Sequence, residues 1–299
     1  MPPRGGNRIP LTGLLHIFLF PLLLLATAAS AAPGEGARPV FVEEVPYVRT
    51  PDSVTAAMLE LAAVKAGDHV IDLGSGDGRI VIAAALRGAT GLGVEIDPGL
   101  VAESIANARH AGVAGRARFL EQDLFKTDLA PATVVTMYLL PEVNLQLRPA
   151  ILALRPGTRI VSHDWDMGDW QADRSVTIAV PEKSIGLAKT SRVHLWIVPA
   201  RVGGLWCGVA PGGPAALRLR QSYQFTEGEI RIGGASPAKV SGRIDGAALA
   251  LAGPQSPAAA GLQLALGEAS AQTTAASGEF ATLHGIAWRR ALGDDCPSP

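Results

Sequence analysis

Up to residue 200, short apolar runs of strand length alternate with segments in which apolar residues recur every three or four positions. The predicted strands are residues 69–73, 91–95, 116–120, 133–138, 158–163, 175–180 and 192–198. Helices are predicted over 79–86 and 97–111, and over 50–64, where Thr50 as N-cap precedes Pro51 at the first helical position. This alternation predicts an α/β domain over residues 33–200 with a doubly wound, mostly parallel sheet, covered on both faces.

The pattern changes near Arg201, beyond which short alternating apolar runs are separated by Gly, Pro and Ser. These runs are residues 217–221, 223–225, 229–232, 240–244, 248–251, 262–266 and 283–288. They predict a small antiparallel all-β domain over residues 201–299, a sandwich or a barrel. We expect its aromatic residues, Trp206, Tyr223, Phe225 and Trp288, to lie in its core rather than to form a binding platform.

Residues 1–32 differ from the rest of the chain. Arg4 and Arg8 precede an apolar run over 11–26, and small residues follow at 28–32, which is typical of a secretory signal peptide. The run is short for a membrane span, which needs about 20 apolar residues, although 9–32 as one helix would make an uncleaved anchor. We expect an exported protein, periplasmic or membrane-anchored at the bacterial envelope; an anchor that leaves the domain facing the cytoplasm stays open.

Composition limits the classes of partner. Charged residues make up 18% of the chain and the formal net charge is −1, so no basic field favours nucleic acid as a partner. The six histidines are scattered without the spacing of metal ligands. In an exported protein the only two cysteines, Cys207 and Cys296, are expected to pair; two free thiols are the alternative.

A glycine-rich turn follows the first predicted strand. Asp72 ends that strand, and Gly74, Gly76 and Gly78 follow, so that a ligand can approach the backbone closely. A dinucleotide fingerprint would need its third glycine at position 79, which is Arg79, and Asp72 would repel a pyrophosphate. A carboxylate there suits a ligand with an ammonium and a sulfonium group, and the helix N-terminus suits the carboxylate of the same ligand.

Two further acids follow successive strands. Glu95 ends the second strand at the spacing where an acid accepts both hydroxyls of a ribose, and Asp123, after the third strand, can reach an adenine amino group. Because the carboxyl ends of parallel strands share one edge of a sheet, Asp72, Glu95 and Asp123 define one crevice for an adenosyl amino acid.

Residues 45–200 resemble the class I, seven-stranded S-adenosylmethionine-dependent methyltransferases, which have a Rossmann-like sheet. Residues 72–79 match the first motif of that family, and Glu95 and Asp123 match its ribose and adenine acids. The motif and the upstream residues 47–51 are also similar to those of small lysine N-methyltransferases. The resemblance implies S-adenosyl-L-methionine as cofactor, bound by Tyr47, Thr50, Asp72, Gly74, Ser75, Gly76, Asp77, Gly78, Glu95, Ile96, Asp123 and Leu124.

Several of these residues have a second interpretation. The glycines can simply form a tight turn, and Asp72 can cap the helix that follows. Asp77 either caps that helix or contacts the methionine part of the cofactor, and we expect Arg79 to pair with a carboxylate of the protein.

The substrate side carries weaker signals. Residues 137–142 lack the polar residue of the Asn/Asp-Pro-Pro-aromatic motif, so methylation of DNA or glutamine loses support. Residues 162–170 contain acids and two tryptophans, Trp165 and Trp170, which either hold a cationic amine or form a surface loop with packed tryptophans. We predict Asp164, as a group that takes or guides a proton, and Tyr138 as catalytic residues, and a protein lysine or a small amine as the methyl acceptor.

Three functions therefore compete. The first is an active methyltransferase at the envelope, with membrane association through the N-terminal segment. The second is an exported, non-catalytic scaffold whose β-domain binds a partner or a glycan. The third, a nicotinamide oxidoreductase, conflicts with Asp72 and Arg79. Export itself conflicts with a cofactor that is made in the cytoplasm.

Overall fold

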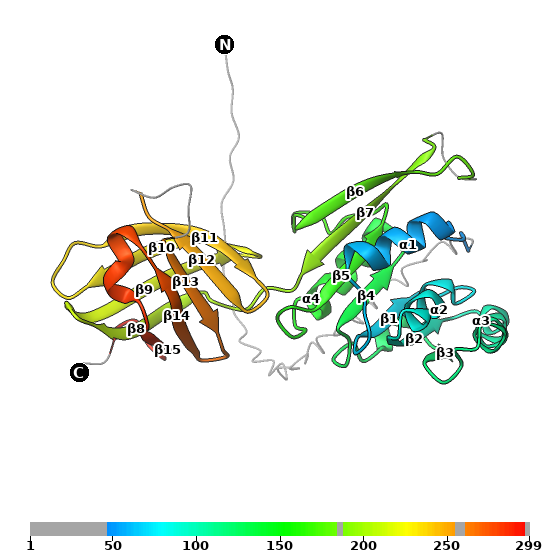
Figure 1. Cartoon of the computed structure of the whole chain (residues 1–299), viewed down its shortest axis with the longest axis horizontal. Helices are drawn as coiled ribbons and strands as arrows, with labels where there is room; N and C mark the ends of the chain where they lie inside the picture. The colour runs from blue at the N-terminus through cyan, green and yellow to red at the C-terminus, as the bar shows by residue number, and fades with distance from the viewer. Residues whose placement is uncertain (1–46, 184–187, 255–260, 297–299) are drawn as a thin grey trace, which may run out of the picture. The chain divides into compact units, whose positions relative to one another are not determined.

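The computed structural model describes residues 47–183, 188–254 and 261–296 (Figure 1). The predicted signal peptide, residues 1–32, lies outside these ranges. Within them, no helix combines the length and the apolar character that a membrane crossing requires.

The first part, residues 47–200, is the sheet domain. Its strands are β1 (His69–Leu73), β2 (Thr90–Glu95), β3 (Ala117–Glu121), β4 (Val134–Met137), β5 (Arg159–His163), β6 (Arg174–Ala179) and β7 (Thr190–Ile197). They pair in the order β3-β2-β1-β4-β5-β7-β6, with β7 antiparallel to both neighbours. The predicted mostly parallel sheet is confirmed. The strand order reverses between β1 and β4, and such a switch point opens a crevice at the carboxyl ends of the strands.

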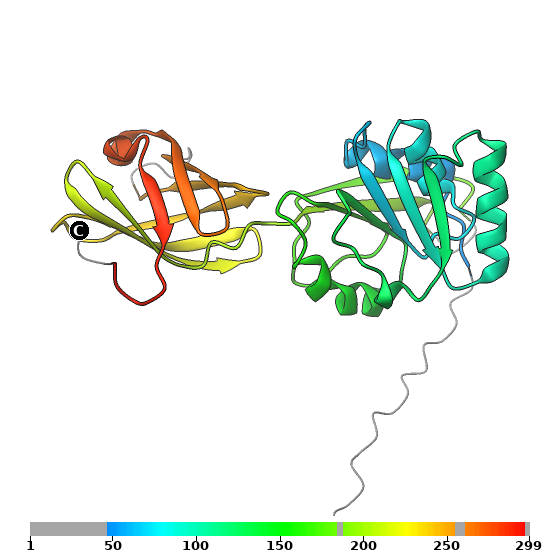
Figure 2. The ribbon, with the colours of Figure 1, turned by 90° about the horizontal axis from the view of Figure 1, so that it is seen from below.

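In the described part of the sheet domain, four helices cover the sheet: α1 (Asp52–Leu61), α2 (Arg79–Leu86), α3 (Pro98–His110) and α4 (Pro141–Ile151). Because successive strand residues point to opposite faces, Val70 packs with α1 and α2, whereas Ile71 packs with α4. Figure 2 shows α1 and α4 on opposite sides of the sheet. The helices therefore hold the strand ends in place from both faces.

Two details of the predicted helices are wrong. Helix α1 starts at Asp52 with Pro51 in the N-cap position and no side-chain cap, so Thr50 is not the cap. It ends at Leu61, not residue 64, because Ala63 turns to a φ of +49°. Helix α4 was not predicted, since Pro141 at its start and Pro149 inside it obscure the helical pattern.

Residues 204–290 form the second part, the barrel. Its strands are β8 (Gly204–Ala210), β9 (Gly213–Ser222), β10 (Phe225–Ile232), β11 (Ala238–Asp245), β12 (Ala248–Ala252), β13 (Leu262–Leu266), β14 (Ser270–Ala276) and β15 (Ala287–Arg290). Each strand pairs antiparallel with the next, and β15 closes the barrel on β8. Of the two predicted architectures, the barrel is therefore the correct one.

The barrel core is apolar, and Trp206 and Trp288 are fully buried in it, as predicted. Tyr223 instead lies in the turn between β9 and β10 with a φ of +53°, and Phe225 is 41% exposed. Strands β8 and β14 were missed, and residues 278–283 form a 3₁₀ helix in a region where no helix was expected. Alternation alone does not identify strands as rich in small residues as these two.

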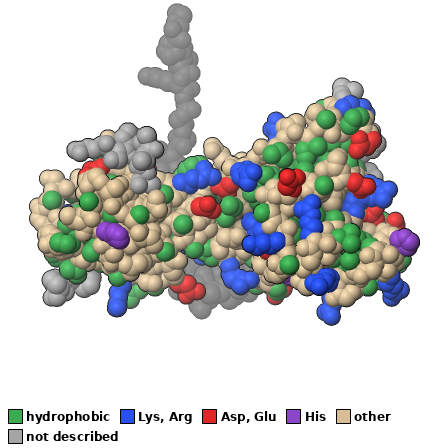
Figure 3. Space-filling view, viewed as in Figure 1, with side chains coloured by type: hydrophobic (Ala, Val, Ile, Leu, Met, Phe, Trp, Pro, Cys, Tyr) green, Lys and Arg blue, Asp and Glu red, His purple; other side chains and the backbone are tan. Residues whose placement is uncertain are grey.

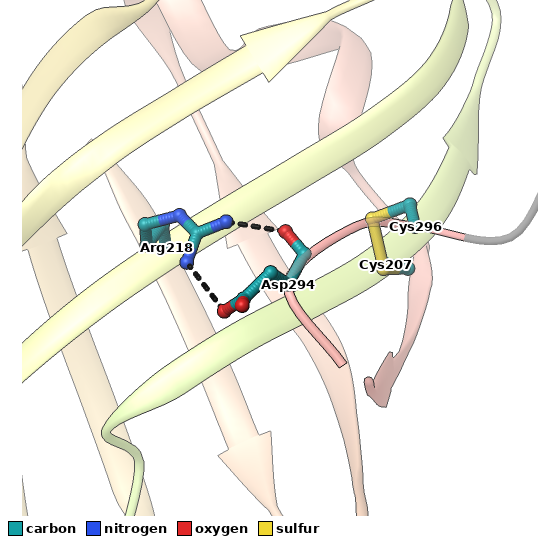
Figure 4. Close-up of a disulfide and its surroundings, with 4 residues drawn as sticks. All are labelled: Cys207, Arg218, Asp294 and Cys296. Carbon is teal, nitrogen blue, oxygen red and sulfur yellow. Dashed lines mark hydrogen bonds and ion pairs between the residues drawn. A yellow bond between two sulfur atoms is a disulfide. The ribbon is translucent and has the colours of Figure 1, made fainter. Parts of the chain in front are cut away.

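A disulfide joins Cys207 in β8 to Cys296 beyond β15 (Figure 4). The predicted pairing is confirmed. Beside it, Arg218 donates to the carbonyl oxygen of Asp294 at 2.5 Å. The first and last strands of the barrel, β8 and β15, pair through Arg289 with Cys207 and Arg290 with Trp206. The disulfide therefore links β8 covalently to the segment that follows β15.

Candidate active site

Asp72 is a buried carboxyl at the carboxyl end of β1. It is 2% exposed, and its side chain accepts a hydrogen bond of 2.6 Å from the hydroxyl of Thr136, its register partner on β4. Burial, together with the negative charges of Glu95 and Asp77, raises the pKa of Asp72 to about 7. A cation bound beside Asp72 would stabilise the ionised carboxylate and lower its pKa. The predicted ligand, which carries an ammonium and a sulfonium group, is such a cation.

The glycine turn is attached to the end of β2. The carboxylate of Glu95 accepts the amide of Gly76 at 2.9 Å through Oε2 and the amide of Ile96 at 2.8 Å through Oε1. The amides of Gly74 and Ser75 both donate to the carbonyl oxygen of Val94. The Ser75 hydroxyl is buried without a hydrogen-bond partner and lies against Gly93 of β2, where an added Cβ would meet it at 2.6 Å.

Gly76 and Gly78 have different structural roles in the turn. Gly76 has a φ of +51°, and a Cβ there would lie 2.1 Å from the ring of Tyr47, which rests on the turn. A Cβ on Gly78, at φ +80°, would instead lie 2.6 Å from Phe119 and from Ser104. Gly76 therefore makes room for the ring of Tyr47 on the turn, whereas Gly78 serves the packing of α2 against its neighbours.

Asp77 sits in an ion-pair network. Its carboxylate lies 2.7 Å from Nη2 of Arg79 and 3.1 Å from Nε of Arg49, and burial raises its pKa. Arg79 also donates to the carbonyl oxygen of Thr50 at 2.7 Å and to Asp52. The expected carboxylate pairing of Arg79 is confirmed. The N-cap position of α2 is Gly78, and the carboxylate of Asp77 accepts the first amide of the helix, that of Arg79, at 3.3 Å. The network fastens residues 47–52 to the glycine turn.

Asp123, which is predicted to reach the adenine, and the predicted cofactor-binding residues Ile96 and Leu124 lie beyond β2 and β3. Ile96 is 72% exposed, and the apolar side chain of Leu124 is half-buried. The carboxylate of Asp123 accepts the amide of Phe125 at 3.0 Å and thereby caps a 3₁₀ turn, Leu124–Lys126. An exposed isoleucine beside Glu95 is a surface on which a flat base can stack, and the adenine contact of these residues stays a prediction.

The acceptor side brings Tyr138, after β4, against His163, at the end of β5, with ring centroids 3.8 Å apart. Burial lowers the pKa of His163 to about 4, so the imidazole is neutral at physiological pH. Its Nε2 lies 2.9 Å from the hydroxyl of Ser191, and its Nδ1 is buried without a partner. Sequence reasoning gave His163 no role, because nothing in the sequence places it against Tyr138.

Asp164, the predicted proton acceptor, is already engaged. Its Oδ2 accepts from Nζ of Lys183 at 2.7 Å, and its Oδ1 accepts from the amide of Arg192 at 2.8 Å. Burial raises the pKa of Asp164, but the hydrogen bonds from Lys183 and Arg192 outweigh burial and hold this pKa below its usual range. Asp164 is thus a weak proton acceptor and a good partner for an ammonium group.

The acceptor side contains a cavity of about 340 Å³. Tyr138, His163 and Lys183 line it together with Arg49, Asp52 and Arg79. The cavity therefore connects the segment that fastens the glycine turn with the acceptor side. The strongly exposed Asp52 shows that it is open to solvent.

The two tryptophans of residues 162–170 have different environments. Trp165 is 43% exposed, whereas Trp170 is fully buried. Trp170 donates from Nε1 to Gln224 at 3.1 Å and stacks on Tyr223 with centroids 5.9 Å apart. The interpretation of Trp170 as a ring face for a cationic amine is wrong, because this side chain packs in the core. For the exposed Trp165, contact with a cationic amine stays a prediction.

The chain is similar to known methyltransferases. The family model of the ANTKMT methyltransferase domain matches residues 72–174. A protein-lysine N-methyltransferase of Saccharolobus islandicus is 43% identical over 141 residues, which cover 46% of this chain and 88% of that protein. The chain belongs to the class I S-adenosylmethionine-dependent methyltransferase family. Its cofactor is S-adenosyl-L-methionine, and the protein is an enzyme of the transferase class.

Other relatives differ in what their names say they modify. A lysine N-methyltransferase of Caenorhabditis elegans, named for one of the subunits of ATP synthase, is 30% identical, over 50% of this chain and 82% of that protein. The mouse protein of the same name is 38% identical, but this chain spans only 43% of its length. A solved RNA methyltransferase of Salinibacter ruber in complex with S-adenosyl-L-homocysteine is 49% identical, covering 52% of this chain and 96% of that one, with a TM-score of 0.47.

Proposed function

We propose that this methyltransferase transfers the methyl group of S-adenosylmethionine to the side-chain amine of a protein lysine. The observation that carries the proposal is an amine at the acceptor-side cavity: Lys183 lines this cavity together with Tyr138 and His163, and its ammonium group is bound by the carboxylate of Asp164. The names of the relatives from Saccharolobus islandicus and Caenorhabditis elegans support a lysine acceptor.

Residues of the crevice have separate roles in cofactor binding. Asp72 would face the cationic part of the cofactor, Glu95 its ribose, and Ile96 the adenine. The glycine turn, with the ring of Tyr47 resting on Gly76, would lie along the ligand. When bound, the cofactor supplies an electrophilic methyl group with a sulfur leaving atom, so no nucleophilic side chain of the enzyme is required.

The enzyme contributes alignment rather than strong base catalysis. The lysine amine must be neutral to react, yet the lowered pKa values of His163 and Asp164 make both groups poor proton acceptors near neutral pH. We infer that the amine loses its proton to water through the open cavity. The ring of Tyr138 and the carboxylate of Asp164 then orient the amine toward the crevice.

We also propose that the protein works at the cell envelope. The signal-like residues 1–32 and the disulfide between Cys207 and Cys296 support exposure of the barrel to an oxidising compartment. A periplasmic reporter fused after residue 299 tests this: activity of the reporter supports it, and an inactive reporter on a stable fusion contradicts it.

The lysine acceptor is tested by incubating the full chain with methyl-labelled cofactor and a protein extract of the source organism. Acid hydrolysis should release label as mono-, di- or trimethyllysine, and Asp72→Asn should abolish it. Label in RNA, or in other amino acids instead of lysine, would contradict the proposal and leave the family assignment intact.

A further inference from the structure

We propose that Lys183 is itself a methyl acceptor, so that the enzyme modifies a lysine of its own chain. This inference rests on the proposed lysine specificity and extends it to one residue. It starts from the position of the side chain: Lys183 lines the same cavity as Tyr138 and His163, at the carboxyl ends of β4 and β5.

The amine of Lys183 is held in a built site. Its Nζ donates to Oδ2 of Asp164 at 2.7 Å and to the carbonyl oxygen of Thr190 at 2.8 Å, and the side chain is 16% exposed. An ammonium group has three N–H donors, so one direction is left for a further contact. The flexible four-carbon stem lets the amine leave Asp164 without a change in the backbone.

The remaining lysines provide an internal comparison. The chain has only five, and all of them lie in the described residues. Lys65, Lys126, Lys189 and Lys239 are exposed, and none of these four lines the cavity. Undirected methylation would favour the exposed side chains, whereas a reaction in the cavity selects Lys183.

The step balances with the known cofactor alone. The ammonium of Lys183 gives one proton to water, and the lone pair of the neutral amine forms a bond to the methyl carbon. The bond between that carbon and sulfur breaks, its electron pair stays on sulfur, and S-adenosylhomocysteine is released. Monomethyllysine keeps the two N–H donors that Asp164 and Thr190 use after it is protonated again, so we expect one methyl group to be added.

The experiment follows the label in the full chain. Purified protein is incubated with trideuteromethyl-labelled S-adenosylmethionine, digested, and mapped by mass spectrometry. We expect one labelled methyl group at Lys183 and none at the four exposed lysines. Label should be lost in Lys183→Arg, which preserves the positive charge beside Asp164, and retained in the matched variant Lys189→Arg.

Two further measurements separate the outcomes. Calorimetric binding of S-adenosylhomocysteine should be the same in Lys183→Arg and in the wild type, which shows that the cofactor crevice is intact. Methylation of lysines in the protein extract while Lys183 stays unlabelled would overturn the inference and leave the proposed function standing. Label spread over the exposed lysines would also overturn it. Transfer to no lysine at all, with cofactor bound, would refute both proposals.

Discussion

The crevice of the sheet domain and the interior of the barrel bury different kinds of side chain. In the described residues, Thr226 and Thr273 are the buried polar side chains hydrogen-bonded within the barrel, and Gln224 is buried where it bonds to Trp170 and Gln171 of the sheet domain; all three are neutral. The sheet domain instead buries charged groups, and Asp72 has only a neutral hydroxyl as side-chain partner. A buried acid without a cation costs stability, so its presence marks the place where a cationic ligand is bound.

The surface of the sheet domain is also more charged than that of the barrel on the face shown in Figure 3. Both signs are interspersed there, so this face presents no single-sign field for a polyanion. This difference separates a domain that buries acids suited to ligand binding from a barrel whose buried polar groups are neutral. It can be tested by substitutions that affect one region only.

The largest effect is expected from Trp288→Ala in the barrel core. Removing a fully buried tryptophan leaves a cavity and should lower the free energy of unfolding by about 3–5 kcal/mol. Denaturant titration measures the loss, and Phe225→Ala, at an exposed aromatic of the same barrel, should cost far less. Cofactor affinity should not change; a large loss of affinity would show that the two regions are not separable.

Removing the disulfide comes next. The double variant Cys207→Ser with Cys296→Ser removes a covalent link between two positions that are 89 residues apart in sequence. The barrel should lose about 2–4 kcal/mol of stability because the unfolded chain is no longer constrained. Thermal unfolding with and without a reductant provides the measurement. An unchanged Tm under reduction would show that strand pairing alone closes the barrel.

Asp72→Asn should have the opposite effects to the two barrel variants: weaker cofactor binding and higher stability. The amide keeps a partner for Thr136 but loses the negative charge, so the Kd for S-adenosylmethionine should rise about tenfold to a hundredfold. The same variant should unfold at a higher temperature at pH 8, because a costly buried charge is gone. Calorimetry and thermal unfolding together test both signs, and tight binding by the variant would remove Asp72 from the cofactor site.

Gly76→Ala tests the contact between the turn and the ring of Tyr47. The new Cβ would meet the ring of Tyr47, so the ring must move and cofactor affinity should fall about tenfold, while strain at positive φ costs about 1 kcal/mol of stability. Gly112→Ala is the matched control, since it also has positive φ but open space around it. It should lose similar stability without a change in affinity.

The smallest effect is a pH dependence. The raised pKa of Asp72, about 7 in the cofactor-free chain, means that below pH 7 the carboxyl is protonated and must release its proton to bind a cation. Affinity should therefore weaken about tenfold from pH 8 to pH 6. Through the same group, stability should decrease as the pH rises from about 4 to 7. Asp72→Asn should flatten both slopes, and equal slopes in variant and wild type would assign them to other groups.

The sequence by itself determined the features that depend on neighbours in the chain. The glycine turn, the acids that end β1 and β2, and the alternation of strand and helix follow from periodicity and from residue types at short spacing. Local patterns failed where prolines interrupted α4 and where small residues hid β8 and β14. Local patterns also could not decide between a sandwich and a barrel, because that choice depends on whether β15 pairs with β8.

Only the tertiary structure brought together groups that lie far apart in sequence. It placed the ring of His163 against Tyr138, the amine of Lys183 on Asp164, and the ring of Tyr47 over Gly76. It also buried Trp170, which the sequence left open as a binding surface. These contacts depend on strand order, on register and on which face of the sheet a side chain occupies. Such relations arise only when the chain packs into three dimensions.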